Sequence, residues 1–209
     1  MTDYALTAAD IRSMLETLSG KDRHIAAAVE LVGFPNERRI EHGFKTLLSV
    51  IAGQQLSVKA AATIRERVYA LMTDGVSPAA LMALEDEPLR GAGLSRQKIL
   101  YARSLAMEIM EGRLDFDALP HMSDADTMKV ITAVKGLGRW SAEMYMMFAL
   151  GRADVWPVDD LAVRVGVGRI IGHEDRPTPK ALDEIGERWR PYRSAVALLA
   201  WHYYSNAPL

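Results

Sequence analysis

The chain has 209 residues, of which 49% are hydrophobic, so it is long enough to bury a substantial core. It contains no cysteine, which excludes disulfides, thiolate zinc sites and cysteine-ligated iron–sulfur clusters and fits a reducing cytoplasm. The net charge of −2 argues mildly against a nucleic-acid partner, because phosphate contacts favour a basic surface. The N-terminus is acidic and polar, and no apolar run reaches membrane-spanning length, so we expect a cytoplasmic protein without a membrane segment.

Helix-capping residues recur along the chain and predict an all-α fold of ten to twelve helices. Helices are expected to start next to Thr7, Asp22, Ser57, Ser77, Ser95, Ser123, Asp160 and Pro179. Nearly continuous apolar character predicts a buried helix over 44–55, and further helices are expected at 139–150 and 192–204. Strand-like alternation is absent at any length. We expect one compact domain over residues 1–209, built as one body or as two helical lobes with a cleft between them.

A Gly-x-Gly turn separates two predicted helices in the segment VKGLGRWSA, residues 134–142. Two glycines let the chain reverse tightly and direct backbone N–H groups outward at a helix N-terminus, a geometry that binds a phosphate oxygen. The alternative is that Gly136 is a helix C-cap and Gly138 an ordinary turn residue. A second Gly-x-Gly, in GAGLS at 91–95, lacks any supporting feature, and we assign it no function.

Two aspartates, Asp159 and Asp160, follow Pro157 in the segment WPVDDL. Capping of the next helix explains one of the two carboxylates but leaves the other without a structural role. A fixed carboxylate at a helix N-terminus stays ionised, and it can stabilise the oxocarbenium-like state of glycosidic bond cleavage or activate water. This pattern alone is a weak signal.

Taken together, several separated blocks resemble the helix-hairpin-helix/glycine-proline-aspartate (HhH-GPD) DNA glycosylases, with DNA-3-methyladenine glycosylase II, the AlkA type, as the closer match. The blocks are residues 49–64, 93–106, 134–143, 154–164 and 188–201, and they cover most of the chain from Phe44 onward. The resemblance implies a compact, two-lobed helical fold without the additional N-terminal sheet domain of many AlkA-type proteins. It also implies a monofunctional enzyme of base excision repair that flips alkylated purines of the 3-methyladenine type and hydrolyses their N-glycosidic bond.

The family's catalytic aspartate maps to Asp159, with Asp160 ranked second. Bifunctional members carry a catalytic lysine two residues past the second hairpin glycine, where this chain has Trp140, which implies a glycosylase without AP lyase activity. By the same resemblance, Trp140 and Trp201 line the base pocket, where an indole face attracts a positively charged alkylated base.

Two further pocket positions depart from the family pattern: Met144 stands where a tyrosine is expected, and His202 replaces another aromatic hydroxyl. A core-filling methionine and a solvated or satisfied histidine explain these two residues equally well. The departures leave the range of substrates open.

The resemblance assigns DNA-backbone binding to Gly136, Leu137, Gly138 and Arg139, with charge added by Lys135. Base flipping needs a residue that fills the vacated space in the duplex, and the family places it in the loop of AGQQLS. Gln55 is the candidate wedge, with Gln54 and Leu56 beside it; the alternative is an ordinary turn before the Ser57 cap.

No cofactor is expected for catalysis, but family members often bind a monovalent cation, Na⁺ or K⁺, at the hairpin. The backbone carbonyls that would hold it map to Thr132, Val134 and Leu137. The expected partner is double-stranded DNA containing alkylated bases, and the expected state is a monomer.

Three other interpretations stay open. A glycosylase of the same superfamily for a deaminated or oxidised base is the nearest enzymatic alternative. A non-catalytic helix-hairpin-helix module that senses damaged DNA belongs to a different class, although binding alone requires neither the P-x-D aspartate nor the paired tryptophans. An all-α protein without a nucleic-acid role is the third.

Overall fold

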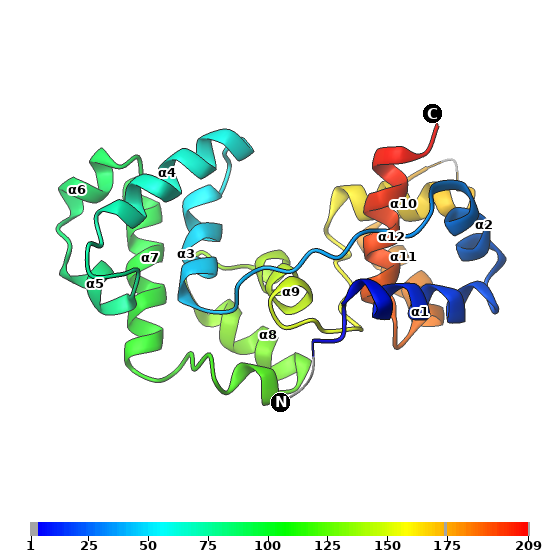
Figure 1. Ribbon diagram of the computed structural model, residues 1–209, viewed down its shortest axis with the longest axis horizontal. Helices are drawn as coiled ribbons and strands as arrows, with labels where there is room; N and C mark the ends of the chain where they lie inside the picture. The colour runs from blue at the N-terminus through cyan, green and yellow to red at the C-terminus, as the bar shows by residue number, and fades with distance from the viewer. Residues whose placement is uncertain (1–3, 174, 209) are drawn as a thin grey trace. The chain divides into compact units, whose positions relative to one another are not determined.

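The computed structural model describes residues 4–173 and 175–208, which contain helices and no strand, so the all-α prediction is confirmed. The first helices are α1 (Ala8–Ser19), α2 (Arg23–Val32), α3 (Phe44–Gly53), α4 (Val58–Ala70), α5 (Pro78–Ala83), α6 (Asp86–Gly91) and α7 (Arg96–Met110). The others are α8 (Asp124–Ala133), α9 (Arg139–Phe148), α10 (Leu161–Ile170), α11 (Pro179–Gly186) and α12 (Arg193–Asn206), with short 3-10 helices at Leu119–His121 and Glu187–Trp189. Figure 1 shows them in chain order.

The chain divides into two compact units. Unit 1 contains Ile40–Tyr145, and unit 2 contains the described parts of Thr2–Arg39 and Met146–Leu209. The expectation of a single domain over the whole chain stays a prediction.

Unit 1 is organised around α7, which packs against α3, α5 and α6, while α3 also packs against α4 (Figure 1). The buried face of α3 carries Leu47, Leu48 and Ile51, and that of α7 carries Ile99, Ala102 and Leu105. These spacings of three and four residues place each set on one side of its helix. Burying such a leucine or isoleucine contributes about 1.5–3 kcal/mol to stability. This packing therefore holds α3 in place, together with the start of the loop that follows it.

Unit 2 is organised around α12, which packs against α1, α2 and α10. Its residues 193–201 are all buried, as expected of a helix with neighbours on every side. The contact with α10 is close: a Cβ added to Gly166 would lie 2.2 Å from the carbonyl oxygen of Ala200. The start of α1 is the predicted capping box, in which the Thr7 hydroxyl accepts from the Asp10 N–H and the Asp10 carboxylate accepts from the Thr7 N–H.

Several predicted helix ends were wrong by one or two residues. The helix expected over 44–55 ends at Gly53, because Gln54 is extended, with ψ 134°, and Gln55 is left-handed, with φ 58°. The helix expected over 139–150 ends at Phe148, and the last helix runs from Arg193 to Asn206. Within residues 4–173 and 175–208, no helix is long and apolar enough to cross a membrane.

Candidate functional site

The predicted turn between two helices is present at residues 134–138 in unit 1. Helix α8 ends at its C-cap Val134, the Leu137 N–H donates to the Val134 carbonyl at 3.1 Å, and Leu137 is buried. The Gly138 carbonyl accepts from the Ala142 N–H at 3.1 Å and so begins α9. The turn therefore leads directly into the N-terminus of α9, the end of a helix that favours anions. Its role in DNA binding stays a prediction.

The two glycines of this turn differ in whether the structure requires a residue without a side chain. Gly136 has φ 88°, and a Cβ added there would lie 2.2 Å from Cδ2 of Tyr101, so the backbone packs directly against that ring. A Cβ on Gly138 would meet nothing within 4 Å. Because Val134 is the C-cap of α8, the alternative interpretation of Gly136 as that cap is wrong. The surface next to Gly138 is open.

Positive charge lies at the start of α9. Arg139, at the first position of the helix, donates from Nε to Oε1 of Glu143 at 2.8 Å. The Glu143 side chain is 2% exposed and that of Arg139 is 54% exposed, so a buried carboxylate anchors a solvent-facing guanidinium. The exposed Lys135 lies within the turn, and its N–H donates to the Ser104 hydroxyl at 3.2 Å. The positive end of the α9 dipole adds to this charge.

The loop between α3 and α4 holds the predicted wedge. Gln55 is left-handed, which costs a non-glycine residue about 1–2 kcal/mol and marks a conformation imposed by its surroundings. The Gln54 side chain is engaged inside the unit, donating from Nε2 to the Gly136 carbonyl at 2.7 Å. Leu56 is partly exposed, so Gln55 and Leu56 are better placed than Gln54 to contact a ligand. No local pattern in the sequence indicated the Gln54 contact, because it joins residues 82 positions apart.

The structure brings Trp140 and Gln55 together on one cavity of about 510 Å³ in unit 1. Its lining consists of Ser49, Val50, Gly53, Gln54, Gln55, Trp140 and Ser141. The Trp140 side chain is large and apolar and yet 47% exposed, which is unusual for a residue that only fills a core. The cavity therefore combines an exposed indole with the strained loop.

In unit 2, the two aspartates of WPVDDL differ in their contacts. Asp160 is the N-cap of α10, and its Oδ1 accepts from the Val163 N–H and from Nε1 of Trp201, both at 3.0 Å. Asp159 lies exposed in the preceding turn. Across residues 4–173 and 175–208 its carboxylate makes no hydrogen bond or ion pair. The structural role thus belongs to Asp160, and the catalytic role of Asp159 stays a prediction.

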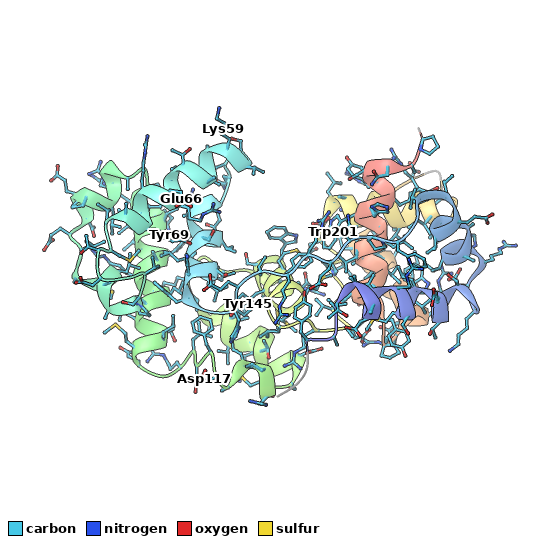
Figure 2. The ribbon with its side chains drawn as sticks, in the orientation of Figure 1. Lys59, Glu66, Tyr69, Asp117, Tyr145 and Trp201 are labelled. Atoms are coloured by element: carbon cyan, nitrogen blue, oxygen red, sulfur yellow. The ribbon has the colours of Figure 1, made fainter. Side chains whose placement is uncertain are left out.

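Trp201 lies on α12 (Figure 2), where it is 9% exposed. Its ring lies 5.8 Å from that of Phe148, and the Arg38 guanidinium lies 5.8 Å from the Trp201 ring centroid. The contact with Arg38 was not predicted, since the two residues are far apart in the sequence. Together with the bond to Asp160, these contacts fix the orientation of the indole.

The surroundings of Met144 fit a core-filling methionine, and the contacts of His202 fit a histidine with satisfied hydrogen bonds. Met144 is buried in α9. The His202 Nε2–H donates to the Val32 carbonyl at 2.7 Å, which leaves Nδ1 to accept from Nδ2 of Asn206 at 3.2 Å. Roles of both residues in a base pocket stay predictions.

The carbonyls mapped to a monovalent cation are those of Thr132, Val134 and Leu137, at the end of α8 and in the turn. Neutral backbone oxygens are hard donors of the type that alkali and alkaline-earth cations take, so the donor set fits Na⁺ or K⁺. The Val134 carbonyl already accepts one N–H, from Leu137, and keeps a second lone pair. In the part of the chain that the structure describes, no group of three or more His, Asp or Glu side chains is placed to hold a metal ion.

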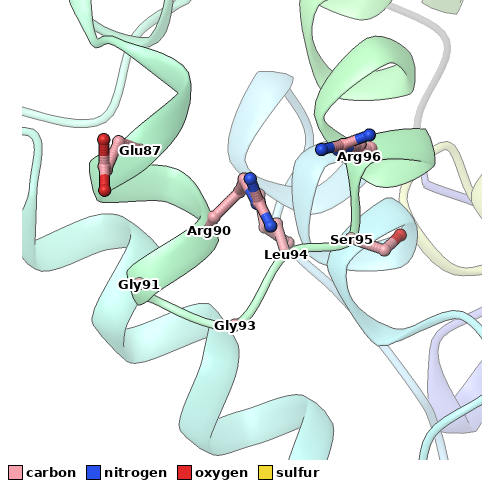
Figure 3. Close-up of a pocket in the computed structure, with 7 residues that line it drawn as sticks. All are labelled: Glu87, Arg90, Gly91, Gly93, Leu94, Ser95 and Arg96. Carbon is pink, nitrogen blue, oxygen red and sulfur yellow. The ribbon is translucent and has the colours of Figure 1, made fainter.

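A separate cavity of about 730 Å³ lies at the GAGLS segment, lined by residues of α6, the turn and the first residue of α7 (Figure 3). Gly93 has φ 110° there, and Ser95 caps α7 by accepting from the Lys98 N–H at 3.2 Å. Exposed Arg90 and Arg96 and the acidic Glu87 border the cavity. These features are explained by the reversal of the chain between two helices, and we assign the cavity no function.

Comparison with known proteins gives one family and several similar proteins. The sequence matches the family described as "HhH-GPD superfamily base excision DNA repair protein" over residues 48–191. DNA-3-methyladenine glycosylase 1 of Schizosaccharomyces pombe is 31% identical over 203 residues, covering 94% of this chain and 87% of the relative. The putative DNA-3-methyladenine glycosylase YfjP of Bacillus subtilis is 30% identical over 165 residues, or 76% of this chain and 58% of that longer relative.

Two solved structures share the fold. A DNA-3-methyladenine glycosidase from Bacillus halodurans superimposes with a TM-score of 0.86 at 34% identity, covering 92% of this chain and 89% of that one. The 3-methyladenine DNA glycosylase Mag1 of S. pombe, solved in complex with abasic DNA, gives a TM-score of 0.79 at 30% identity, with coverage of 90% and 95%.

Proposed function

Because the chain belongs to the HhH-GPD superfamily of base excision DNA repair proteins, we propose that it is a DNA glycosylase that excises alkylated purines. The substrate is double-stranded DNA carrying 3-methyladenine-type lesions, and the products are the free base and an abasic site. The proposal includes the type II designation, the absence of AP lyase activity, a monomeric state and action on chromosomal DNA in the cytoplasm.

The observation that carries the proposal is the cavity shared by Trp140 and Gln55. An exposed indole offers a flat, electron-rich face to a base with a positive charge, which attracts it by a cation–π interaction. A side chain held in a strained loop at the edge of the same cavity is suited to fill the space that a flipped base leaves in the duplex. The relatives named as 3-methyladenine glycosylases support the same substrate class, and the Mag1 complex with abasic DNA supports DNA as the partner.

Asp159 is the proposed catalytic residue. Hydrolysis breaks the bond between C1′ of the deoxyribose and the base nitrogen, and the bonding electrons leave with the base. An alkylated purine is already cationic, so it leaves as a neutral base without a general acid. The sugar becomes an oxocarbenium-like cation that an ionised carboxylate stabilises, or the carboxylate positions the water that attacks C1′. The exposed, uncommitted carboxylate of Asp159 can do either, whereas that of Asp160 is held by Val163 and Trp201.

The other proposed roles belong to residues of the hairpin and of the base pocket. Gly136 to Arg139 hold the DNA backbone through the start of α9, and Na⁺ or K⁺ at the carbonyls of Thr132, Val134 and Leu137 would fix the turn. Trp201 in unit 2 is the second aromatic proposed to contact the base, and its bond to Asp160 sets the orientation of its indole. For Met144 and His202 we retain pocket positions as the weaker part of the proposal.

The test is release of free base from duplex DNA treated with a methylating agent, followed by chromatography. We expect the protein to release 3-methyladenine and to leave strands that break only after hot alkali. Position 140 carries tryptophan in place of the lysine whose amine would form a Schiff base. Release only from duplexes with hypoxanthine or 8-oxoguanine would move the activity to another lesion. Tight binding to damaged DNA without release of any base would leave a damage-sensing module.

Replacing Trp140 with leucine is expected to reduce release of cationic 3-methyladenine by about tenfold, since a desolvated cation–π contact contributes about 1–2 kcal/mol. Release of neutral hypoxanthine, if any is measurable, should fall less. Trp140→Phe is the matched control, because it keeps an aromatic face and should retain most of the preference. Single-turnover rates on both substrates check this. An equal loss on charged and neutral bases would remove the cation–π role from Trp140.

A further inference from the structure

Gln54 joins the loop between α3 and α4 to the hairpin. Its Nε2 donates to the carbonyl of Gly136 at 2.7 Å. Since a carbonyl oxygen only accepts, the partner itself determines that the nitrogen of the side-chain amide points to the hairpin. The contact therefore depends on a donor of this length at position 54.

Both ends of this contact are held in place. On the hairpin side, the backbone of Gly136 packs against the ring of Tyr101, too close to admit a Cβ. On the loop side, the carbonyl of Ala52 near the end of α3 accepts from Nζ of Lys98 at 2.9 Å, and burial lowers the pKa of that lysine. Both Tyr101 and Lys98 belong to α7, so one helix supports the two segments that Gln54 connects.

Gln55, the residue after Gln54, has a strained backbone conformation. Gln55 has φ 58°, a conformation that a non-glycine residue keeps only where its surroundings impose it. The bond from Gln54 links the Gly136 carbonyl to the residue directly before Gln55, so a movement of that carbonyl would act on the loop through Gln54. The Gly136 carbonyl lies in the same turn that presents the N-terminus of α9.

We infer that Gln54 is a positioning residue that couples the hold of the hairpin on the DNA backbone to the insertion of Gln55 into the duplex. The inference rests on the proposed function. Gln54 itself neither stacks on the base nor reacts. It keeps Gln55 in its conformation at the edge of the Trp140 cavity. Binding of the hairpin to a phosphate and insertion of Gln55 into the duplex are thereby coupled.

The test is a double-mutant cycle on the rate of base flipping. Gln54→Met keeps the length of the side chain and removes the donor, and Gln55→Gly removes the wedge and the need for a strained conformation at once. Flipping is followed by the fluorescence of 2-aminopurine placed next to 7-methylguanine in a duplex, and base release is measured in parallel. Gln97→Met is the matched control, because Gln97 is an exposed glutamine on α7 whose side chain makes no hydrogen bond within residues 4–173 and 175–208.

We expect Gln54→Met to slow flipping by about three- to tenfold, as for the loss of one hydrogen bond, while affinity for undamaged duplex DNA stays unchanged. In the Gln55→Gly background, Gln54→Met should add less than a twofold effect, because residues that act through one another are not additive. Wild-type flipping in Gln54→Met would overturn the inference. So would equal effects in both backgrounds, which a general loss of stability would also produce.

The two failures are distinguishable. A wild-type protein that flips the base but releases none refutes the proposed glycosylase activity, and the cycle on flipping rates still decides the role of Gln54. Normal release by the wild type with an additive cycle keeps the glycosylase and removes the coupling.

Discussion

Replacing Asp159 with asparagine is expected to slow base release by about a thousandfold while DNA binding persists. Asparagine keeps the size of the side chain and removes the negative charge that the oxocarbenium-like transition state requires. The carboxylate is exposed, and it makes none of the structural bonds found in residues 4–173 and 175–208, so the fold should tolerate the change. Single-turnover release of 3-methyladenine, together with binding to a damaged duplex, measures the two effects separately.

Asp160→Asn is the control for this prediction. Asparagine is as good an N-cap as aspartate, and its side-chain oxygen can still accept from Val163 and Trp201. We expect nearly unchanged stability and activity within about tenfold of wild type, since the substitution removes the negative charge of residue 160 but keeps its hydrogen bonds. Full activity in Asp159→Asn with loss in Asp160→Asn would reverse the assignment of the catalytic carboxylate.

Replacing Gly136 with alanine is expected to destabilise unit 1 by about 3 kcal/mol or more. The left-handed backbone at φ 88° contributes part of this cost, and the overlap with the Tyr101 ring contributes the rest. The backbone there cannot move away without also breaking the contact between Gln54 and the Gly136 carbonyl. Urea denaturation followed by circular dichroism gives the change in free energy of unfolding.

Gly138→Ala provides the comparison, because its Cβ enters open space and its φ is not left-handed. We expect its unfolding free energy to stay within about 1 kcal/mol of wild type, the usual cost of a tolerated surface substitution. If a phosphate approaches the start of α9 at this glycine, DNA affinity should nevertheless fall in Gly138→Ala. Equal stability of the two variants would mean that Tyr101 does not constrain the turn.

The starts of the helices could be predicted from the sequence, because an N-cap is a local interaction. The side chains of Thr7, Ser57, Ser95 and Ser123 each accept from a backbone N–H three residues ahead, as their positions before apolar-periodic segments indicated. The ends of helices were less predictable. Helix α3 ends directly before Gln54, whose side chain donates to the Gly136 carbonyl, a contact that no local pattern encodes.

The candidate site was predictable as a set of residues, but not as a set of contacts. The sequence left open which aspartate of WPVDDL caps α10, and the answer includes a bond to Trp201, 41 residues downstream. The ring of His202 is engaged by the carbonyl of Val32, 170 residues away. Neither partner follows from spacing or composition, because each depends on how α12 packs against earlier helices.

The division of the chain has a consequence for synthesis on the ribosome. Unit 1 is one continuous segment, Ile40–Tyr145, whereas unit 2 combines helices from before and after it. Helices α1 and α2 are synthesised before unit 1, but α12, against which both pack, is synthesised after it. All of unit 1 is therefore synthesised while α1 and α2 still lack this partner, so their apolar faces must be kept from aggregating until α12 has been made.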